Sequence, residues 1–436
     1  MIDPITFVLR FIFDFWWLLL PLFLWQIYWE QYKSIKQTDY SKNIEWDFIE
    51  IKFPANILKT PKAMEEALNA LHSIHPDENK EMTWYNLNIK GFTPLSYAFL
   101  IIFNQKKLRF FIRFPKQLNN FLKTRLYTFY PDLQLENVPD PLAILPPQIP
   151  NSFFDVASYD VRLKKEDAYP IKTYQYIDVP SAEQPIDIFA SFSEASNEIE
   201  NNEWLIIQLL AVPTTANNNK IGKKWIKRAE ETKNKLIGKE ETKENPLTEE
   251  IVEFIKNLLS SPWVEITWKN KEEQKKKEFS LQQLTPGEKN VLEKIENKMA
   301  KLGYWCNIRV AYIAPQDIIE QRKKIIETLI KSLFKNFDSE DSNGFVVNEL
   351  TYRRIIPPNL SLLSFIAKSL EYNDIIKYRK ITLPSYMKKQ FAELKLDEGF
   401  ILNTEELASI FHPPLTSVEA IGFKKIQTKH IPPPTF

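Results

Sequence analysis

The sequence predicts an α+β protein in which an N-terminal transmembrane helix is followed by two ferredoxin-like units of the split βαβ type, the second with a long helical insertion. Three observations lead to this fold class: a long apolar run near the N-terminus, the element order βαββαβ after it, and a partial repeat of that order. The predicted segments are a transmembrane anchor at 1–32, a first domain at 40–142, a second domain at 150–356 with an insertion at 213–287, and a helical, proline-rich tail at 357–436.

Composition limits the classes of function. The 436 residues can hold two or three domains with sizeable cores. Their 57 Lys and Arg against 56 Asp and Glu give a formal net charge of +1. The overall electrostatic field of the protein is therefore too weak to attract a polyanion such as nucleic acid. The eight glycines leave little material for loops that wrap phosphates. The single cysteine, Cys306, excludes an intrachain disulfide and is typical of a reducing compartment.

The first element is the apolar run at 5–29, which contains several Trp and Tyr residues. At about 1.5 Å per residue, its length is sufficient to cross a hydrocarbon core of roughly 30 Å. Lys33, Lys36 and Lys42 come after the run, which predicts a single-pass anchor with the large C-terminal part in the cytoplasm. Two alternatives are a cleaved signal peptide and a helix lying in the membrane interface.

The first ferredoxin-like unit is read from alternating strand and helix patterns. Its hairpin has a short polar turn around Gln105 and Lys106, and its second helix opens on Pro115. The predicted elements are a strand at 44–53, a helix at 61–74, strands at 96–104 and 107–114, a helix at 115–130 and a strand at 132–138.

The second unit repeats this order around the insertion. A strand, a proline and a long amphipathic helix recur, with Pro315 equivalent to Pro115. The predicted elements are strands at 159–165 and around 174–177, a helix at 185–199, a strand at 203–212, a helix at 287–301, a strand at 304–314, a helix at 315–334 and a strand at 344–354. The insertion adds helices at 223–237 and 248–259 and a charged loop at 269–278.

No motif in the sequence specifies a reaction. The Gly-Lys pairs at 221–225 and 237–241 lack the earlier glycine and the following hydroxyl of a Walker A loop. His72 and His75 are three residues apart, and three acids lie nearby, but His75 precedes a proline and marks a helix stop more simply than a metal site. These acids are Asp77, Glu78 and Glu81.

The remaining reactive residue types favour structural roles. Cys306 lies in an alternating strand beside Trp305, which predicts a buried thiol, and His412 and His430 lie in the tail, where we expect them to be solvated. The sequence therefore predicts no catalytic, cofactor-binding or metal-binding residue, and a protein that is not an enzyme.

Two basic stretches combine Lys and Arg with aromatic residues, a combination that can contact a phosphate backbone. They contain Lys224, Lys227, Arg228 and Lys235 beside an exposed Trp225, and Lys377, Arg379 and Lys380. The alternative is a solvated helix with pairs such as Lys227 and Glu231, and the interleaved acidic residues favour it.

The C-terminal stretch at 401–436 begins with a capped helix. Asn403 or Thr404 is the predicted cap, and Glu405 and Glu406 lie where the helix dipole favours negative charge. Leu407, Ile410 and Phe411 form an apolar stripe, and Pro413 and Pro414 end the helix.

Four stretches carry a resemblance to a known family: KTPKAMEEALNALHSIH, LRFFIRFPKQLNNFLKTRLYTFYPDLQLENVPD, GYWCNIRVAYIAP and FILNTEELASIFHPP. They resemble a bacterial family in which a membrane-anchored region precedes a P-loop motor similar to the coupling ATPases of conjugation and type IV secretion. In that family the LNTEELA stretch lies just before the motor, which is absent from these 436 residues. Both a split and a truncated motor protein remain open.

The resemblance implies a non-catalytic, membrane-anchored subunit that mounts or positions a separate coupling-type ATPase of a DNA or protein translocation machine. We expect residues 400–436 to be a tail that docks on this P-loop partner. The alternative function is a stand-alone, membrane-tethered module that binds DNA or a protein substrate. Weak nucleic-acid contact and homo-oligomers remain possible partners, and no cofactor is expected.

Overall fold

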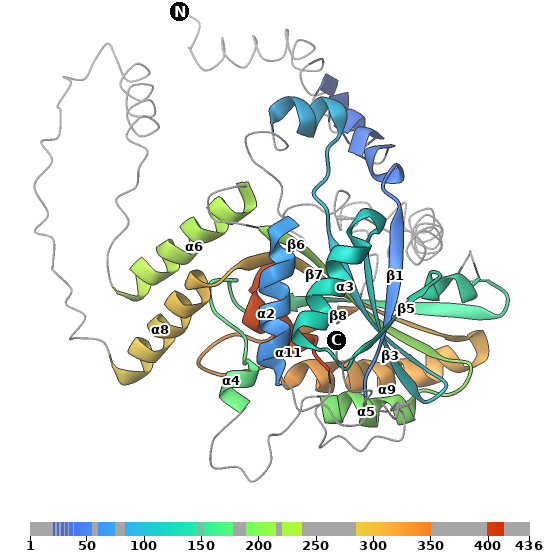
Figure 1. The fold of residues 1–436 in the computed structure, drawn as a ribbon. Coiled ribbons are helices and arrows are strands. Elements are labelled where there is room, and N and C mark those ends of the chain that lie inside the picture. The colour runs from blue at the N-terminus through green and yellow to red at the C-terminus, as the bar shows by residue number, and fades with distance from the viewer. Residues whose placement is uncertain are drawn as a thin grey trace, which may run out of the picture.

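Nine strands of the described residues form one antiparallel sheet in the computed structural model of the chain (Figure 1). The order is β4-β1-β3-β2-β6-β7-β5-β8, and β9 pairs with β7. The α+β class is therefore consistent with the prediction. The structure describes residues 60–74, 83–146, 151–177, 189–214, 220–237, 285–349 and 399–413, most of residues 24–54, and the single residues 21 and 149.

The first half of the sheet has the strand order fourth, first, third, second. Its elements are β1 (Trp46–Lys52), α2 (Pro61–Leu71), β2 (Tyr97–Asn104), β3 (Lys107–Pro115), α3 (Asn119–Phe129) and β4 (Gln134–Val138). Gln105 and Lys106 have φ angles of 53° and 56°, which confirms the tight turn predicted between β2 and β3.

The second half has the same strand order, fourth, first, third, second, when it is read from its outer strand β8 inward to β6. Its elements are β5 (Phe154–Leu163), α4 (Tyr174–Ile177), α5 (Phe189–Glu198), β6 (Trp204–Thr214), α6 (Lys220–Leu236), α8 (Pro286–Ala300), β7 (Gly303–Pro315), α9 (Gln316–Lys335), β8 (Phe345–Glu349), β9 (Phe400–Asn403) and α11 (Thr404–Ile410). The strand predicted around 174–177 is wrong, because these residues form the single helical turn α4.

The two halves are related at the prolines that end their third strands. Pro115 pairs with Trp46 and Pro315 pairs with Phe154, the first residues of β1 and β5. The next amide makes an equivalent hydrogen bond in each half, from Lys116 to the carbonyl of Glu45 at 2.9 Å and from Gln316 to that of Phe153 at 3.0 Å.

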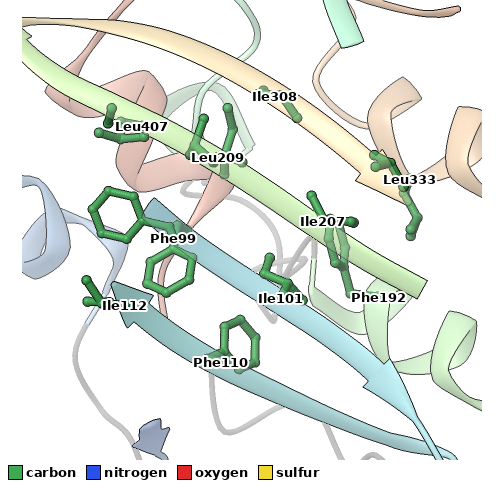
Figure 2. Close-up of a cluster of buried hydrophobic side chains, with 14 of the residues drawn as sticks. Phe99, Ile101, Phe110, Ile112, Phe192, Ile207, Leu209, Ile308, Leu333 and Leu407 are labelled. Atoms are coloured by element: carbon green, nitrogen blue, oxygen red, sulfur yellow. The ribbon is translucent and has the colours of Figure 1, made fainter. Parts of the chain in front are cut away.

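The predicted units are not separate bodies, because β2 pairs along its whole length with β6 and joins the halves into one sheet. The main hydrophobic core is continuous across this junction. Figure 2 shows how it is built: Phe99, Phe110, Ile207 and other strand residues meet Leu407 of α11 and Phe192 and Leu333 of α5 and α9. The helices α2, α3, α5, α9 and α11 thus cover one face of the sheet.

The other face of the sheet carries two smaller apolar clusters. One lies under the short 3₁₀ helix Pro141–Ile144 and includes Leu100 and Ile313. The second places Trp225 of α6 against Leu210 and Trp305, so α6 packs on this face of the sheet.

The predicted single-pass membrane anchor is overturned. In the part of the chain that the structure describes, no helix has the length and apolarity that a membrane-spanning segment needs. The described residues between 24 and 42 are helical, and their polar residues Gln31, Lys33, Lys36 and Asp39 come after the apolar run at 5–29. The transmembrane helix at 1–32, the membrane localisation and the cytoplasm-facing topology are corrected accordingly, although residues 1–20 lie outside the described residues.

Other predictions also fall outside the described residues. They concern the helix at 248–259, the charged loop at 269–278, and residues His75, Asp77, Glu78, Glu81, Lys377, Arg379, Lys380 and His430.

Candidate functional site

The C-terminal segment 399–413 lies inside the fold. β9 pairs antiparallel with β7, from Gly303 opposite Asn403 to Cys306 opposite Phe400. Every residue from 400 to 413 is buried, and the ring of Phe411 lies 4.8 Å from that of Phe99 in the main core. The prediction that this part of the chain is a tail available to a partner is therefore wrong, because its side chains complete the core.

The sequence explains why a helix begins at Thr404. The Asn403 side chain accepts a hydrogen bond from the Glu406 amide at 2.8 Å, and the Glu406 carboxylate accepts one from the Asn403 amide at 2.8 Å. This reciprocal capping box satisfies two N–H groups that the first turn leaves without helical partners. Asn403 is thus the cap, one of the two residues predicted for that role.

Glu406 also forms an ion pair that is fully shielded from solvent. Its carboxylate lies 3.0 Å from Nζ of Lys298 on α8, and both side chains are 0% exposed. The same carboxylate accepts a hydrogen bond from the Ile171 amide at 2.8 Å. Burial raises the pKa of Glu406, and the Lys298 ammonium opposes this rise. The pair therefore ties α11 to α8 and to the loop before α4.

A second ionic group involves Glu405, the neighbouring residue of α11. Lys301 Nζ lies 2.7 Å from Glu65 of α2 and 2.6 Å from Glu405 of α11. Burial disfavours the charge on Lys301, but its hydrogen bonds to Glu405 and Glu65 outweigh burial and raise its pKa. Tyr174 donates to Glu65 at 2.6 Å, and Thr173 donates to Glu405. We call the two groups together, Glu65, Thr173, Tyr174, Lys298, Lys301, Glu405 and Glu406, the α11 clamp.

Asp167 and Gly399 hold the start of β9 in position. The carboxylate of Asp167 accepts from the Ile401 amide at 3.2 Å and pairs with Arg228 of α6 at 3.0 Å. At Gly399 an added Cβ would lie 2.2 Å from Nε1 of Trp305, so only glycine fits against the indole. The segment is therefore held along its whole length, by β pairing, a cap and two ionic groups.

The chemistry of the α11 clamp is structural. Each of its carboxylates faces an ammonium or a hydroxyl of the protein itself, at distances of 3.1 Å or less. Such an arrangement holds α2, α8 and α11 in a fixed relative position.

The histidines of the described residues do not form a metal site. His72 is buried, with Nε2 3.1 Å and 3.0 Å from the carbonyl oxygens of Thr214 and Gly303, so its ring bonds the end of β6 to the start of β7. His412, predicted to be solvated, is instead buried, with Nδ1 2.9 Å from the Ala408 carbonyl. Among the described residues, no three His, Cys, Asp or Glu side chains are grouped to hold a metal ion.

Cys306 is buried in β7, as predicted. Burial raises the pKa of its thiol far above the usual value, which keeps the sulfur in the un-nucleophilic thiol form. Cys306 lies opposite Phe400, so β9 covers this part of β7.

The basic helix α6 forms as predicted, but one of its side chains is not exposed as the sequence indicates. The sequence predicts an exposed Trp225, but this side chain is buried and donates its indole N–H to the Asp167 carbonyl at 3.2 Å. The lysines Lys224, Lys227 and Lys235 are exposed on α6, and none forms an ion pair with a residue that the structure describes. Beside the helix lies a hollow of about 360 Å³ lined by Lys165, Arg228 and other residues of both charges.

In the described residues these features define an α+β fold with one nine-stranded antiparallel sheet, in which β9 and α11 come from the C-terminal segment 399–413. The chain belongs to the family described as domain of unknown function (DUF8128), which matches residues 31–425. The match includes the strands, the α11 clamp and the segment 399–413. A comparison with curated proteins finds no match.

Proposed function

We propose that this chain is a non-catalytic adaptor that positions a separate coupling-type ATPase of a DNA or protein translocation machine. The observation that supports this most is the fixed position of α11. In the family that the sequence resembles, the LNTEELA stretch lies just before the motor, and here that stretch is anchored by β9 pairing and by the ion pairs of Glu405 and Glu406.

The α11 clamp gives this proposal a physical basis. A force applied beyond Pro413 passes into α11 and from there into α2 through Glu65, into α8 through Lys298 and into β7 through β9. Ion pairs shielded from water are weakly screened by salt, so this connection keeps its geometry across ionic conditions. A rigid exit point orients whatever residues 414–436 bind.

A second candidate function is nucleic-acid binding, and the solvent-facing side of α6 favours it. Lys224 and Lys235 are eleven positions apart, about 16 Å along the helix, and Lys227 lies between them. This length is enough to meet two or three phosphates along a strand. The expected pair between Lys227 and Glu231 is not among the ion pairs of the described residues.

One co-purification experiment tests both functions. A coupling-type ATPase is co-expressed with the full chain and with a variant that ends at residue 413, which retains the whole α11 clamp. We expect the ATPase to be recovered with the full chain and lost with the variant, while both chains melt at the same temperature.

Equal recovery of the ATPase with both chains would contradict the adaptor function, and so would no recovery with either. Recovery of DNA in place of the ATPase would favour the second function. Its binding would then weaken steeply as the salt concentration rises, and the Lys224→Glu substitution would weaken it as well.

A further inference from the structure

An exposed aromatic surface lies near the N-terminus, away from the α11 clamp. The described residues between 24 and 42 are helical, and Trp25, Tyr28, Tyr32 and Ile35 follow one another at spacings of three, four and three. This is the heptad spacing of a helix–helix seam. Trp25, Tyr28 and Ile35 are 62%, 57% and 59% exposed, so the seam faces solvent.

The surface extends beyond this helix. Trp29 stacks on Trp84 with ring centroids 6.1 Å apart, and Trp84 and the next residue, Tyr85, are both exposed. Along the seam itself, Tyr28 lies 5.9 Å from Trp25 and 6.2 Å from Tyr32. We call the set Leu24, Trp25, Tyr28, Trp29, Tyr32, Ile35, Trp84 and Tyr85 the aromatic seam.

The aromatic seam is held in a fixed orientation. Gly91 has a φ angle of 72°, and an added Cβ there would lie 2.3 Å from the backbone of Lys36, so the helix rests directly on the turn after Trp84. Tyr40 contacts Phe92, with ring centroids 5.6 Å apart. A surface that is already ordered loses little conformational entropy on binding.

The size of the aromatic seam matches a protein interface. At 150–250 Å² per aromatic side chain, its exposed fractions amount to roughly 700 Å² of apolar surface. Stable interfaces bury about 800 Å² on each partner, and monomers seldom expose a larger contiguous apolar patch.

We propose that the occupant is the same seam on a second copy of this chain, related by a two-fold axis. A two-fold dimer brings each patch against its equivalent, so an aromatic stripe meets an aromatic stripe of the same length and spacing. Lys33 Nζ lies 5.8 Å from the ring centroid of Trp29, and Lys36 Nζ lies 5.7 Å from that of Tyr32. Lysine side chains are long and flexible, so both ammonium groups can turn to solvent at the edge of the dimer interface when the rings are covered.

The mass of the full chain in solution tests this dimer. At about 50 μM, well above the micromolar range of weak interfaces, sedimentation equilibrium is expected to give a dimer. The double variant Tyr28→Glu with Ile35→Glu buries four carboxylates in the dimer seam, so we expect its dimer dissociation constant to rise at least about 100-fold. The matched control Lys33→Glu introduces two carboxylates into the dimer, one per chain, outside the heptad positions, and is expected to stay dimeric.

Circular dichroism and the melting temperature of each variant establish that the chain is folded. A monomeric wild-type chain at this concentration would overturn the proposal, as would a dimer that persists in the double variant. A wild-type chain that remains monomeric but binds lipid vesicles or single-stranded DNA through the same residues would also overturn it.

Discussion

Glu406→Gln is expected to lower the free energy of unfolding by about 3 kcal/mol or more, although it removes only one charge. Glutamine retains an oxygen acceptor beside the amides of Ile171 and Asn403, so part of the hydrogen bonding remains. The substitution leaves behind the Lys298 ammonium, 0% exposed and without its counter-charge. A buried unpaired charge is among the most destabilising changes in a protein interior. Urea unfolding followed by circular dichroism measures the effect.

Two control variants separate this mechanism from a general effect of the substitution. Glu327→Gln removes one partner of an exposed ion pair on α9 and is expected to change stability by less than about 0.5 kcal/mol. Adding Lys298→Met to Glu406→Gln removes the orphaned charge and is expected to restore more than about 1 kcal/mol. If the double variant is as unstable as the sum of its single variants, the ion pair is not the cause.

A chain that ends at residue 398 is expected to have no cooperative unfolding transition, whereas a chain that ends at residue 413 melts like the full protein. The shorter chain loses β9 and α11 together with their buried apolar side chains: Phe400, Ile401, Leu402, Leu407, Ala408, Ile410 and Phe411. At about 1.5–3 kcal/mol for each large side chain, this loss is comparable with the whole stability of a domain, about 5–15 kcal/mol.

The two truncations also differ in the surfaces they leave uncovered. Without the segment, Lys298 and Lys301 lose Glu406 and Glu405, and the edge of β7 from Gly303 to Cys306 loses its paired strand. Differential scanning calorimetry of both chains provides the comparison. A chain ending at 398 that gives the transition of the full protein would show that the segment is dispensable.

Local signals in the sequence predict most elements of the sheet. The polar turn at Gln105 and Lys106, the alternating strands beside it, and the prolines that precede α3 and α9 are all decided by residues close to one another in the chain. The cap at Asn403 is equally local, because its partner Glu406 is three residues away.

The place of segment 399–413 is not predictable in this way. Glu406 meets Lys298 across 108 residues and Ile171 across 235, and Lys301 meets Glu65 across 236. Hydrophobic periodicity in the sequence carries no information about contacts between residues so far apart. Taken by itself, the local pattern of a capped helix followed by two prolines therefore indicates a tail. The apolar residues Phe400, Ile401 and Leu402 ahead of the cap are the one signal of a buried strand.

The errors at Trp225 and His412 have the same origin. Each residue has charged or proline neighbours that are typical of a solvated segment, yet each side chain is buried in the fold. The prediction of a membrane anchor rests on the length and apolarity of the N-terminal run, but among the described residues no helix is long and apolar enough to cross a membrane.

Residues 399–413 thus belong to the folded core and provide a fixed exit for the chain beyond Pro413. Amide hydrogen exchange of the intact chain tests this most directly. We predict that the amides of Asn403, Thr404 and Glu406 exchange as slowly as those in the centre of β7, because each is hydrogen-bonded inside the fold and opens only on global unfolding. Exchange of these amides within seconds, while the amides of β7 remain protected, would contradict the claim that residues 399–413 belong to the folded core.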